Sequence, residues 1–377
     1  MKSVVLGALL ATSISHAGIK LHQQQGTAES RSFFKVSAPV TYHNATLHAG
    51  EQQISISIPN AGMWVAGFNM DKELVQKRGK RVPYLRKSSE QEGLLSCVKN
   101  YCLVAVPHKK IRIFGTLPIE SVVPDIDGNM DYSEFEVRNA MKTIAREKSA
   151  YLLTREGTLR VLGDNHYGQL GLSQEFSRAD QWALVARGVY DIAAGDKFAA
   201  IIKKDRSVWV SGAITGHKAS NRHKFSAAFK GAKKIYANKN LLAVLNQDDD
   251  LYVIGSIGRT PKQSRVFHQW TKLRSSVKTV SIGDNHIAAV DLSGDLYMMG
   301  VNDENQFGRK SKAFHSNWVY CQKNISQVAA GAGFTVAMRK DGVLLGAGRN
   351  NEGQLGLGKM PNAYYWQRIL NVPWVRR

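Results

Sequence analysis

The acidic segment DIDGNMDYSEFE, residues 125–136, has oxygen-bearing side chains at the spacing of a calcium-binding loop. Hard oxygen ligands at positions 1, 3, 5, 7 and 12 of such a loop can surround one Ca²⁺ ion. The side chains at these positions are Asp125, Asp127, Asn129, Asp131 and Glu136. Position 6 is Met130, where the sharp turn of the loop normally requires glycine, and no helical pattern precedes the segment. We therefore favour a solvated acidic loop and expect no cofactor, with calcium as the alternative.

Three cysteines occur in the chain, at positions 97, 102 and 321. Cys97 and Cys102 flank an expected turn between two antiparallel strands, so a short-loop disulfide is feasible in an oxidising compartment. Two buried free thiols are the alternative. Cys321 lies in WVYCQ, an expected outer strand, and is the cysteine left without a partner.

No catalytic motif is present in the sequence. None of the 11 histidines has a cysteine or acidic partner at a metal-binding spacing, and no Gly-x-Ser-x-Gly elbow occurs. Glu147, Asp196 and Asp284 align with one another in the repeat described below, but equivalent positions in a repeat do not by themselves form an acid–base pair. We predict that the protein is not an enzyme.

The first residues, MKSVVLGALLATSISHAG, have a basic start, a short apolar core and small residues before a cleavage point. This pattern is typical of a secretory signal peptide, which we assign to residues 1–17. A polar linker follows at 18–30, and no later segment approaches the ~20 apolar residues of a membrane-spanning helix. We expect an exported protein, either periplasmic or secreted.

The formal net charge of +21 distributes along most of the chain. A positive field of this size attracts polyanions such as nucleic acid, an anionic envelope polymer or an acidic protein. The alternative interpretation is a solvated basic surface that only favours solubility. The net charge therefore indicates possible classes of partner but does not distinguish among them.

The segment VLGDNHYGQLGL, residues 161–172, raises the question of a phosphate-binding glycine loop, because closely spaced glycines let backbone N–H groups approach an anion. The pattern recurs, however, in AGRNNEGQLGLG at 347–358 and in MGVNDENQFG at 299–308. A phosphate loop occurs once per site, whereas a structural turn recurs once per repeat. We interpret these glycines as turn residues.

A glycine ends a short apolar strand seven times, at intervals of 43 to 49 residues. These anchor glycines are Gly67, Gly115, Gly163, Gly212, Gly255, Gly300 and Gly348. A second landmark lies 17 residues before each anchor, at Gly50, Val98, Arg146, Gly195, Asn238, Gly283 and Gly331. A period in the forties indicates a repeat architecture in which each unit is one supersecondary element.

Each unit is expected to contain four short strands. In the fourth copy, residues 189–195, 198–204 and 207–212 form the first three strands, and an outer strand follows a variable loop. The third strand is apolar on both faces, so it must be covered on both faces by neighbouring units. Seven such units over residues 31–377 predict an all-β protein, a seven-bladed β-propeller of four-stranded blades. We also expect the C-terminal strand at 364–372 to close the ring by completing a blade beside N-terminal strands at 32–40.

The loop pattern Gly-x-Asn-x-x-Gly-Gln-Leu-Gly, followed later by Ala-Ala-Gly, resembles the regulator-of-chromosome-condensation repeat family. The matching residues are Gly163, Asn165, Gly168, Gln169, Leu170 and Gly171, then Gly348, Asn350, Gly353, Gln354, Leu355 and Gly356, and finally Gly300, Asn302, Gln306 and Gly308. The family's histidine after the Ala-Ala-Gly turn is retained only as His286. The resemblance implies a binding scaffold whose loops engage another macromolecule, with nucleotide exchange on a small GTPase and inhibition of β-lactamases among its known roles.

Partner binding is predicted at the turns after the second landmarks and at the loops after the anchor glycines, which should share one face. The candidate residues are Lys99, Asn100, Lys148, Tyr167, Lys197, His217, Arg222, His223, Lys239, Asn240 and Asn285. Our leading hypothesis is a monomeric exported protein-binding scaffold, an inhibitor or adaptor of a cell-envelope or extracellular protein whose surface is acidic. A binder of envelope polyanions or glycans is the alternative, and a nucleotide-exchange effector is third.

Overall fold

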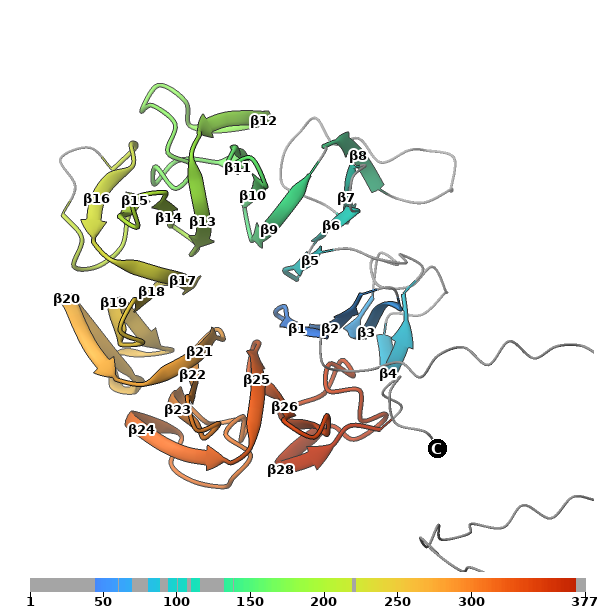
Figure 1. Ribbon diagram of the computed structural model, residues 1–377. Coiled ribbons are helices and arrows are strands. Elements are labelled where there is room, and N and C mark those ends of the chain that lie inside the picture. Colours follow the sequence, from blue (N-terminus) through green and yellow to red (C-terminus); the bar gives the residue numbers. More distant parts are fainter. Residues whose placement is uncertain are drawn as a thin grey trace, which may run out of the picture. The chain divides into compact units, whose positions relative to one another are not determined.

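The computed structural model describes residues 45–59, 61–69, 81–88, 94–99, 101–106, 110–115, 132–137, 139–218 and 222–370. Within these residues, seven antiparallel four-stranded sheets surround a central axis (Figure 1). Each sheet is one blade and contains four strands that are consecutive in the chain. The protein is all-β and a seven-bladed propeller, which confirms the architecture predicted from the repeat.

Blades 1 and 2 contain β1 (Thr46–Ala49), β2 (Gln53–Ile58), β3 (Gly62–Phe68), β4 (Arg81–Lys87), β5 (Leu94–Cys97), β6 (Tyr101–Val106), β7 (Lys110–Gly115) and β8 (Tyr132–Glu136). Blades 3 and 4 contain β9 (Ala140–Arg146), β10 (Ser149–Thr154), β11 (Leu159–Asp164), β12 (Arg178–Ala186), β13 (Val189–Ala194), β14 (Phe198–Lys203), β15 (Val208–Gly212) and β16 (Ser226–Phe229).

Blades 5 and 6 contain β17 (Ala232–Asn238), β18 (Leu241–Asn246), β19 (Leu251–Gly258), β20 (Ser264–Arg274), β21 (Val277–Ile282), β22 (His286–Asp291), β23 (Leu296–Val301) and β24 (Phe314–Gln322), with the short 3₁₀ turn η1 (Pro261–Gln263) before β20. Blade 7 contains β25 (Ile325–Ala330), β26 (Phe334–Arg339), β27 (Leu344–Arg349) and β28 (Asn362–Arg368). In the described part of the chain, no helix is long and apolar enough to cross a membrane.

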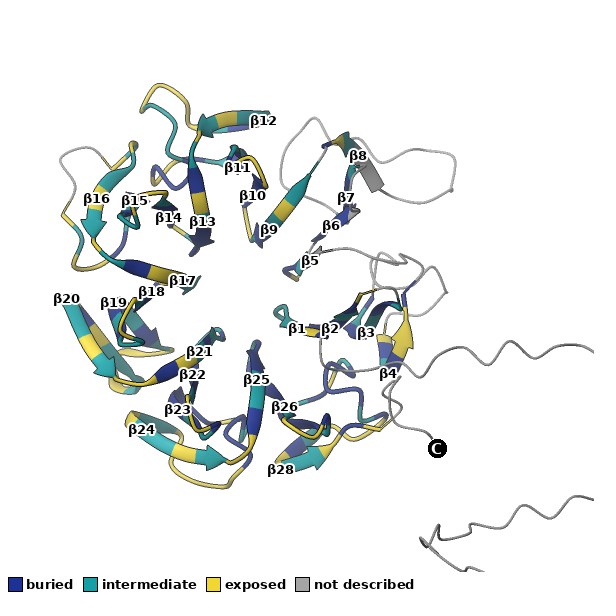
Figure 2. Cartoon of the chain, in the orientation of Figure 1, coloured by how far each residue is buried: buried dark blue, intermediate teal, exposed yellow. Residues whose placement is uncertain are grey.

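The first strand of every blade lies nearest the axis and the fourth lies at the periphery (Figure 1). Second strands such as β18 are buried almost throughout, whereas outer strands such as β20 and β24 consist mostly of exposed and half-buried residues (Figure 2). The hydrophobic core is therefore not one central cluster. It is divided into seven layers, each between two neighbouring blades.

The layer between blades 3 and 4 shows why the third strands are apolar on both faces. Tyr151 and Val161 of blade 3 pack with Ile192 and Ile201 of blade 4, and all four are fully or almost fully buried. On the other face of blade 4, Val208 packs into the layer shared with blade 5. A blade between two neighbours thus buries both sides of its sheet, which requires apolar side chains at successive positions.

The anchor glycines all have a positive φ, the conformation in which glycine carries no steric penalty. At Gly212 the φ is +89°, and a Cβ would lie 2.3 Å from the carbonyl oxygen of Lys197. Two requirements therefore coincide at this position, a left-handed backbone and a close contact with the preceding turn. The recurrence that reveals the repeat in the sequence has this local cause.

The described C-terminal strand β28 completes blade 7 by pairing with β27, and blade 1 contains β1 to β4. The predicted N-terminal strand at 32–40 lies outside the described part, so its place beside the C-terminal strand stays a prediction. In the described part, a hydrophobic layer between blades 1 and 7 joins the first and last blades. Gln327 of β25 strengthens it: its Nε2 donates to Ala45 O (2.6 Å) and its Oε1 accepts from Leu47 N (3.1 Å).

Candidate functional site: the loop face

The face that carries the predicted residues, here called the loop face, bears the turns after the first strands and the loops after the anchor glycines. In six blades the residue after the anchor glycine donates its N–H to the second residue of the turn in the same blade. In blade 4, Ala213 N donates to Lys197 O over 2.7 Å, and in blade 5 Ser256 N donates to Asn240 O over 2.9 Å. The turns and loops therefore emerge together, as the alternation of strand direction predicts.

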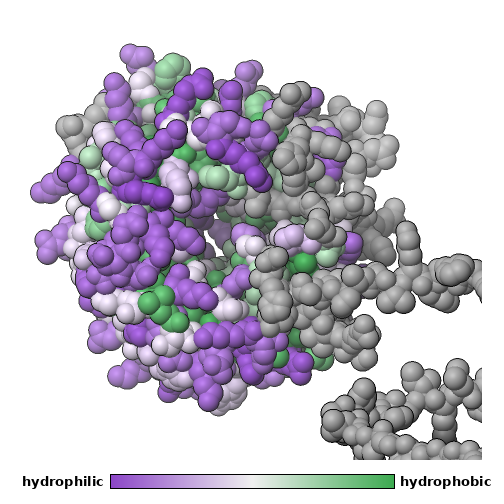
Figure 3. Space-filling view, viewed as in Figure 1, coloured by the Kyte–Doolittle hydropathy of each residue, from purple (hydrophilic) through white to green (hydrophobic). Residues whose placement is uncertain are grey.

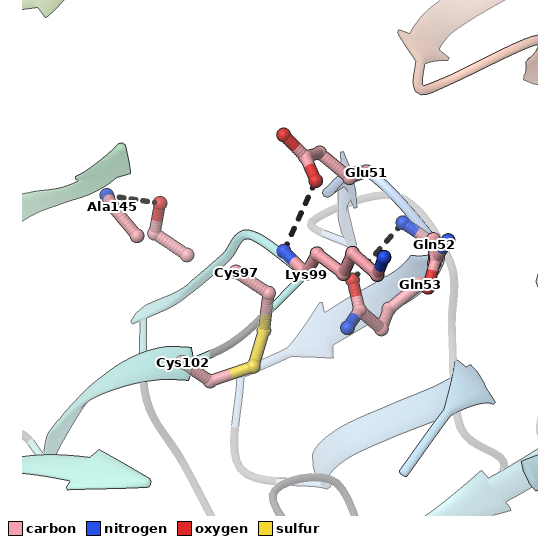
Figure 4. The surroundings of a disulfide bond; sticks show 8 residues. Glu51, Gln52, Gln53, Cys97, Lys99, Cys102 and Ala145 are labelled. Carbon is pink, nitrogen blue, oxygen red and sulfur yellow. Dashed lines mark hydrogen bonds between the residues drawn. A yellow bond between two sulfur atoms is a disulfide. The ribbon is translucent and has the colours of Figure 1, made fainter. Parts of the chain in front are cut away.

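Near the axis the turns of adjacent blades contact each other directly. Asp196 N donates to Lys239 O in the next blade, and Lys99 N donates to the Glu51 carboxylate over 3.1 Å (Figure 4). At Gly195 a Cβ would lie 2.2 Å from the carbonyl oxygen of Lys239. Glycine occurs at this landmark because neighbouring blades approach too closely for a side chain.

Two landmarks that lack glycine use their side chains to connect blades. Arg146 of blade 3 donates from Nε to Ala194 O (2.6 Å), from Nη1 to Asn238 Oδ1 (2.8 Å) and from Nη2 to Ala237 O (3.0 Å). Asn238 is itself the landmark of blade 5. One guanidinium thus joins three blades at the wall of an axial cavity of about 230 Å³. The sequence signal for this role is the break in the glycine pattern at Arg146 and Asn238.

Carboxylates gather around this axial network. Lys239 Nζ forms an ion pair with Asp284 at 3.0 Å. Burial disfavours the charged amine, but attraction from Asp284, Glu51 and Asp196 outweighs it and raises the pKa of Lys239. Burial also raises the pKa of Glu51 and of Asp196, and repulsion from Asp284 adds to both shifts. Asp196 and Asp284, which the repeat aligned, therefore belong to a polar network that links blades.

The glycine loop of blade 3 is held by its own side chains. Asn165 Oδ1 accepts from Leu170 N (2.9 Å), and Gln169 Oε1 accepts from Tyr167 N (3.0 Å). The Asn and Gln of the matching loops in blades 6 and 7 make the same bonds. These loop N–H groups are used within the turn, which supports the structural interpretation over phosphate binding.

A groove of about 620 Å³ opens between the loops of blade 4 and the turn of blade 5. We call it the blade-4 groove, and its polar lining consists of Thr215, Lys197, His217, Lys218, Arg222, Asn240 and Ser256. Four of the predicted partner-binding residues line it, and no acidic residue does. His217 is half-buried, its Nε2 lies 3.0 Å from Ser226 Oγ, and burial lowers its pKa, so the permanent charges are the two lysines and the arginine.

The blade 3 loop brings Tyr167 beside this groove. Gly168 packs against the backbone of Arg222, where a Cβ would lie 2.5 Å from the carbonyl oxygen. Tyr167 is 40% exposed, and Lys197 Nζ lies 4.5 Å from its ring centroid. The two loops therefore gather Tyr167, Lys197, His217 and Arg222 on one side of the loop face.

The remaining predicted residues are more scattered. Lys99 and Lys148 are exposed at the turns of blades 2 and 3, Asn285 lies at the turn of blade 6, and His223 is half-buried in the blade 4 loop. Asn100 lies outside the described residues. Figure 3 shows hydrophilic side chains over most of the described surface in that view, around a hollow near the centre of the ring.

Four of the five candidate calcium ligands, residues 125–131, lie outside the described part of the chain. The fifth, Glu136, ends β8 and is exposed. Among the described residues, no group of three or more His, Cys, Asp or Glu side chains could hold a metal ion. The calcium hypothesis therefore stays a prediction.

Cys97 and Cys102 form a disulfide between directly opposed residues of β5 and β6 (Figure 4). Its sulfur atoms pack in the layer between blades 1 and 2. Cys321 is a free, half-buried thiol in β24, and burial raises its pKa to about 12. A thiol with so high a pKa is protonated and unreactive at neutral pH.

Comparison with known proteins shows which proteins this propeller resembles. Residues 325–354 match the Regulator of chromosome condensation (RCC1) repeat. The regulator of chromosome condensation of Xenopus laevis is 23% identical over 279 residues, which cover 62% of this chain and 66% of the frog protein. One copy of the repeat therefore matches the family model. The chain is similar in sequence and in fold to RCC1-type proteins.

Other proteins match over shorter stretches of sequence or by fold alone. The X-linked retinitis pigmentosa GTPase regulator of the dog is 29% identical over 139 residues, covering 34% of this chain and 14% of that protein. The matches thus span less than two thirds of either curated relative. The crystal structure of Prp20p from Saccharomyces cerevisiae, described with its binding properties to Gsp1p and histones, has a TM-score of 0.67 at 15% identity, covering 88% of both chains. Human WBSCR16 has a TM-score of 0.62 at 16% identity, covering 76% of this chain and 84% of that one.

Proposed function

We propose that the protein is an exported protein-binding propeller that regulates a cell-envelope or extracellular protein, as an inhibitor or adaptor, by docking it on the loop face. The observation that carries the proposal is the convergence of exposed loop residues of blades 3 and 4 around an open groove. The names of related proteins, a GTPase regulator and a guanine nucleotide exchange factor, describe regulators that act on other proteins.

Export is supported by two independent features. The first residues have the pattern of a signal peptide, and the disulfide between Cys97 and Cys102 is a bond that persists in oxidising compartments. Removing residues 2–17 should retain the protein in the cytoplasm with both thiols reduced. Cell fractionation with thiol labelling measures this, and unchanged export of the shortened chain would contradict the proposal.

Docking on the loop face is tested by site-specific photo-crosslinking. A photoreactive amino acid replaces exposed Lys148 on the loop face or, as the matched control, exposed Arg155 at the other end of the same strand. We expect an adduct with a discrete envelope or extracellular protein from position 148 alone. The captured protein is then purified and its binding to the unmodified propeller measured, and equal adducts from both positions would refute the choice of face.

A polyanion binder remains the second candidate because of the net charge of +21. Binding to a polyanion releases counterions, so its affinity should fall linearly on a log–log plot against salt over the whole range. Docking of a folded protein combines buried area with charge and depends less steeply on salt. A salt titration with the captured partner and with a sulfated polysaccharide distinguishes the two candidates.

A further inference from the structure

We propose that the blade-4 groove binds a short acidic segment of the partner protein, with carboxylates paired to Lys197, Lys218 and Arg222. This inference rests on the proposed function, since it names the chemistry of the partner at the same face. The acidic segment would contact one groove between blades 4 and 5, which is only part of the loop face.

Three basic side chains meet in this groove, and its lining contains no carboxylate. Some basic side chains elsewhere pair with carboxylates, as in Lys239–Asp284, Arg259–Asp303 and Lys272–Asp250. In the described part of the chain, no carboxylate forms an ion pair with the three groove cations, and the groove lining contains none. Like charges in one concave site repel one another, so an anionic occupant would relieve this repulsion.

The surroundings of the groove favour a segment over a long polyanion. The adjacent pocket shares Asn240 and Ser256 with the groove, but its lining combines the acidic Asp284 and Glu304 with Lys239, Arg259 and Arg349. Towards the axis, the half-buried carboxylate of Asp196 follows. A nucleic acid or polysaccharide that continued beyond the groove in these directions would meet charges of both signs, with Lys239 and Arg259 already paired to carboxylates, and no continuous basic track. The cation-only surface has the size of a single ligand site.

The groove also contains groups that suit a peptide. The planar guanidinium of Arg222 can hold a carboxylate by two parallel hydrogen bonds, which a lysine cannot do. Asn240 and Ser256 add neutral hydrogen-bonding groups suited to a peptide backbone. Tyr167, exposed beside Lys197, offers an aromatic surface of the kind that concentrates binding energy at interfaces.

The test uses a fluorescein-labelled hexaglutamate peptide and measures its binding to the full exported chain by fluorescence anisotropy. The groove variant is Lys197→Glu/Lys218→Glu/Arg222→Glu. Three surface ion pairs are lost and replaced by repulsion, so the affinity should fall about tenfold or more. A hexaglutamine peptide, which keeps the length and lacks the charge, should not bind.

The matched control is Arg155→Glu/Lys204→Glu/Lys230→Glu, which changes the net charge by the same amount. These three residues are exposed and lie at the opposite ends of the strands, on the hairpin-turn face. This variant should change the affinity by less than about twofold, because exposed charges farther apart than a Debye length are screened. Urea unfolding of both variants shows that the fold is kept.

Three results would overturn the inference: no saturable binding of the hexaglutamate peptide, an equal loss of affinity in both variants, or tighter binding of an oligonucleotide of equal charge with the same dependence on the groove residues. The last result would assign the groove to a polyanion. Photo-crosslinking at Lys148 tests the proposed function separately. If a partner is captured there and the groove variant binds it normally, the loop face is retained and the acidic segment is rejected.

Discussion

His286 should make the stability of the propeller depend on pH. Its side chain is fully buried between blades 6 and 7, and its Nε2 lies 2.9 Å from Thr335 Oγ1. Desolvation by burial lowers its pKa to about 3. The perturbation is His286→Phe, which removes the titrating group, and phenylalanine already occupies the equivalent positions of blades 4 and 7 as Phe198 and Phe334.

The magnitude follows from linkage between protonation and folding. In the unfolded chain histidine has a pKa of about 6.5, so below that pH the unfolded state binds a proton that the folded state excludes. The stability is therefore fully present above about pH 6.5 and falls as the pH decreases towards the folded pKa. Between pH 7 and pH 5 this single group should remove about 2 kcal/mol of unfolding free energy.

The assay is urea unfolding of both proteins at pH 7, 6 and 5, followed by tryptophan fluorescence. The other histidines are present in both proteins, among them His48, His217 and His315, whose pKa burial lowers, so their contributions cancel in the difference. Between pH 7 and pH 5 the free energy of unfolding of the wild-type protein should fall by about 2 kcal/mol more than that of the variant. If the variant has a lower free energy of unfolding by the same amount at every pH, the extra pH dependence of the wild-type protein can still be read from the slopes. If the free energy of unfolding changes with pH equally in the two proteins, His286 is not its cause.

Three further predictions concern the contacts between blades and strands. Gly195→Ala places a methyl group 2.2 Å from a carbonyl oxygen of the next blade, so urea unfolding should show a free energy of unfolding lower by about 3 kcal/mol. Gly231→Ala, where the methyl group would lie in open space, should lower it by only about 1 kcal/mol through backbone strain. Arg146→Ala removes three charge-assisted hydrogen bonds and should lower the free energy of unfolding by about 2–4 kcal/mol. Arg146→Lys should recover only part of this stability, and a lysine variant as stable as the wild-type protein would contradict the bridging geometry. Cys97→Ser/Cys102→Ser opens a short loop and should cost about 2 kcal/mol, while peptide mapping without reductant that finds two free thiols in the wild-type protein would remove the basis of that prediction.

Several features of the fold could be predicted because their causes are local. An anchor glycine such as Gly163 is required by a positive φ, and the side chains of Asn165 and Gln169 hold the turn that follows it. Such requirements fix the residue type at a fixed place in every repeat, so they recur along the sequence. The four-strand unit, the number of blades and the shared face of turns and loops all follow from that recurrence.

Part of the candidate site was also accessible from the sequence. Lys197, His217, Arg222 and Asn240 were selected as polar or basic residues at turns and loops, and the structure brings them to one groove. The sequence did not distinguish this groove from the other blades, because the turns are polar in six of the seven blades. Packing of the blade 3 loop on the blade 4 loop made that distinction.

By itself the sequence determined the repeat, the strand pattern and the residues that shape each turn, since these depend on neighbours within one unit. Only the tertiary structure decided how the ring closes, which blades Arg146 joins and which basic residues lack an acidic neighbour. Gln327 and Ala45, which help to close the ring, are 282 positions apart in the chain. No periodicity records such a contact, because it depends on the shape of the completed ring and occurs once in the molecule.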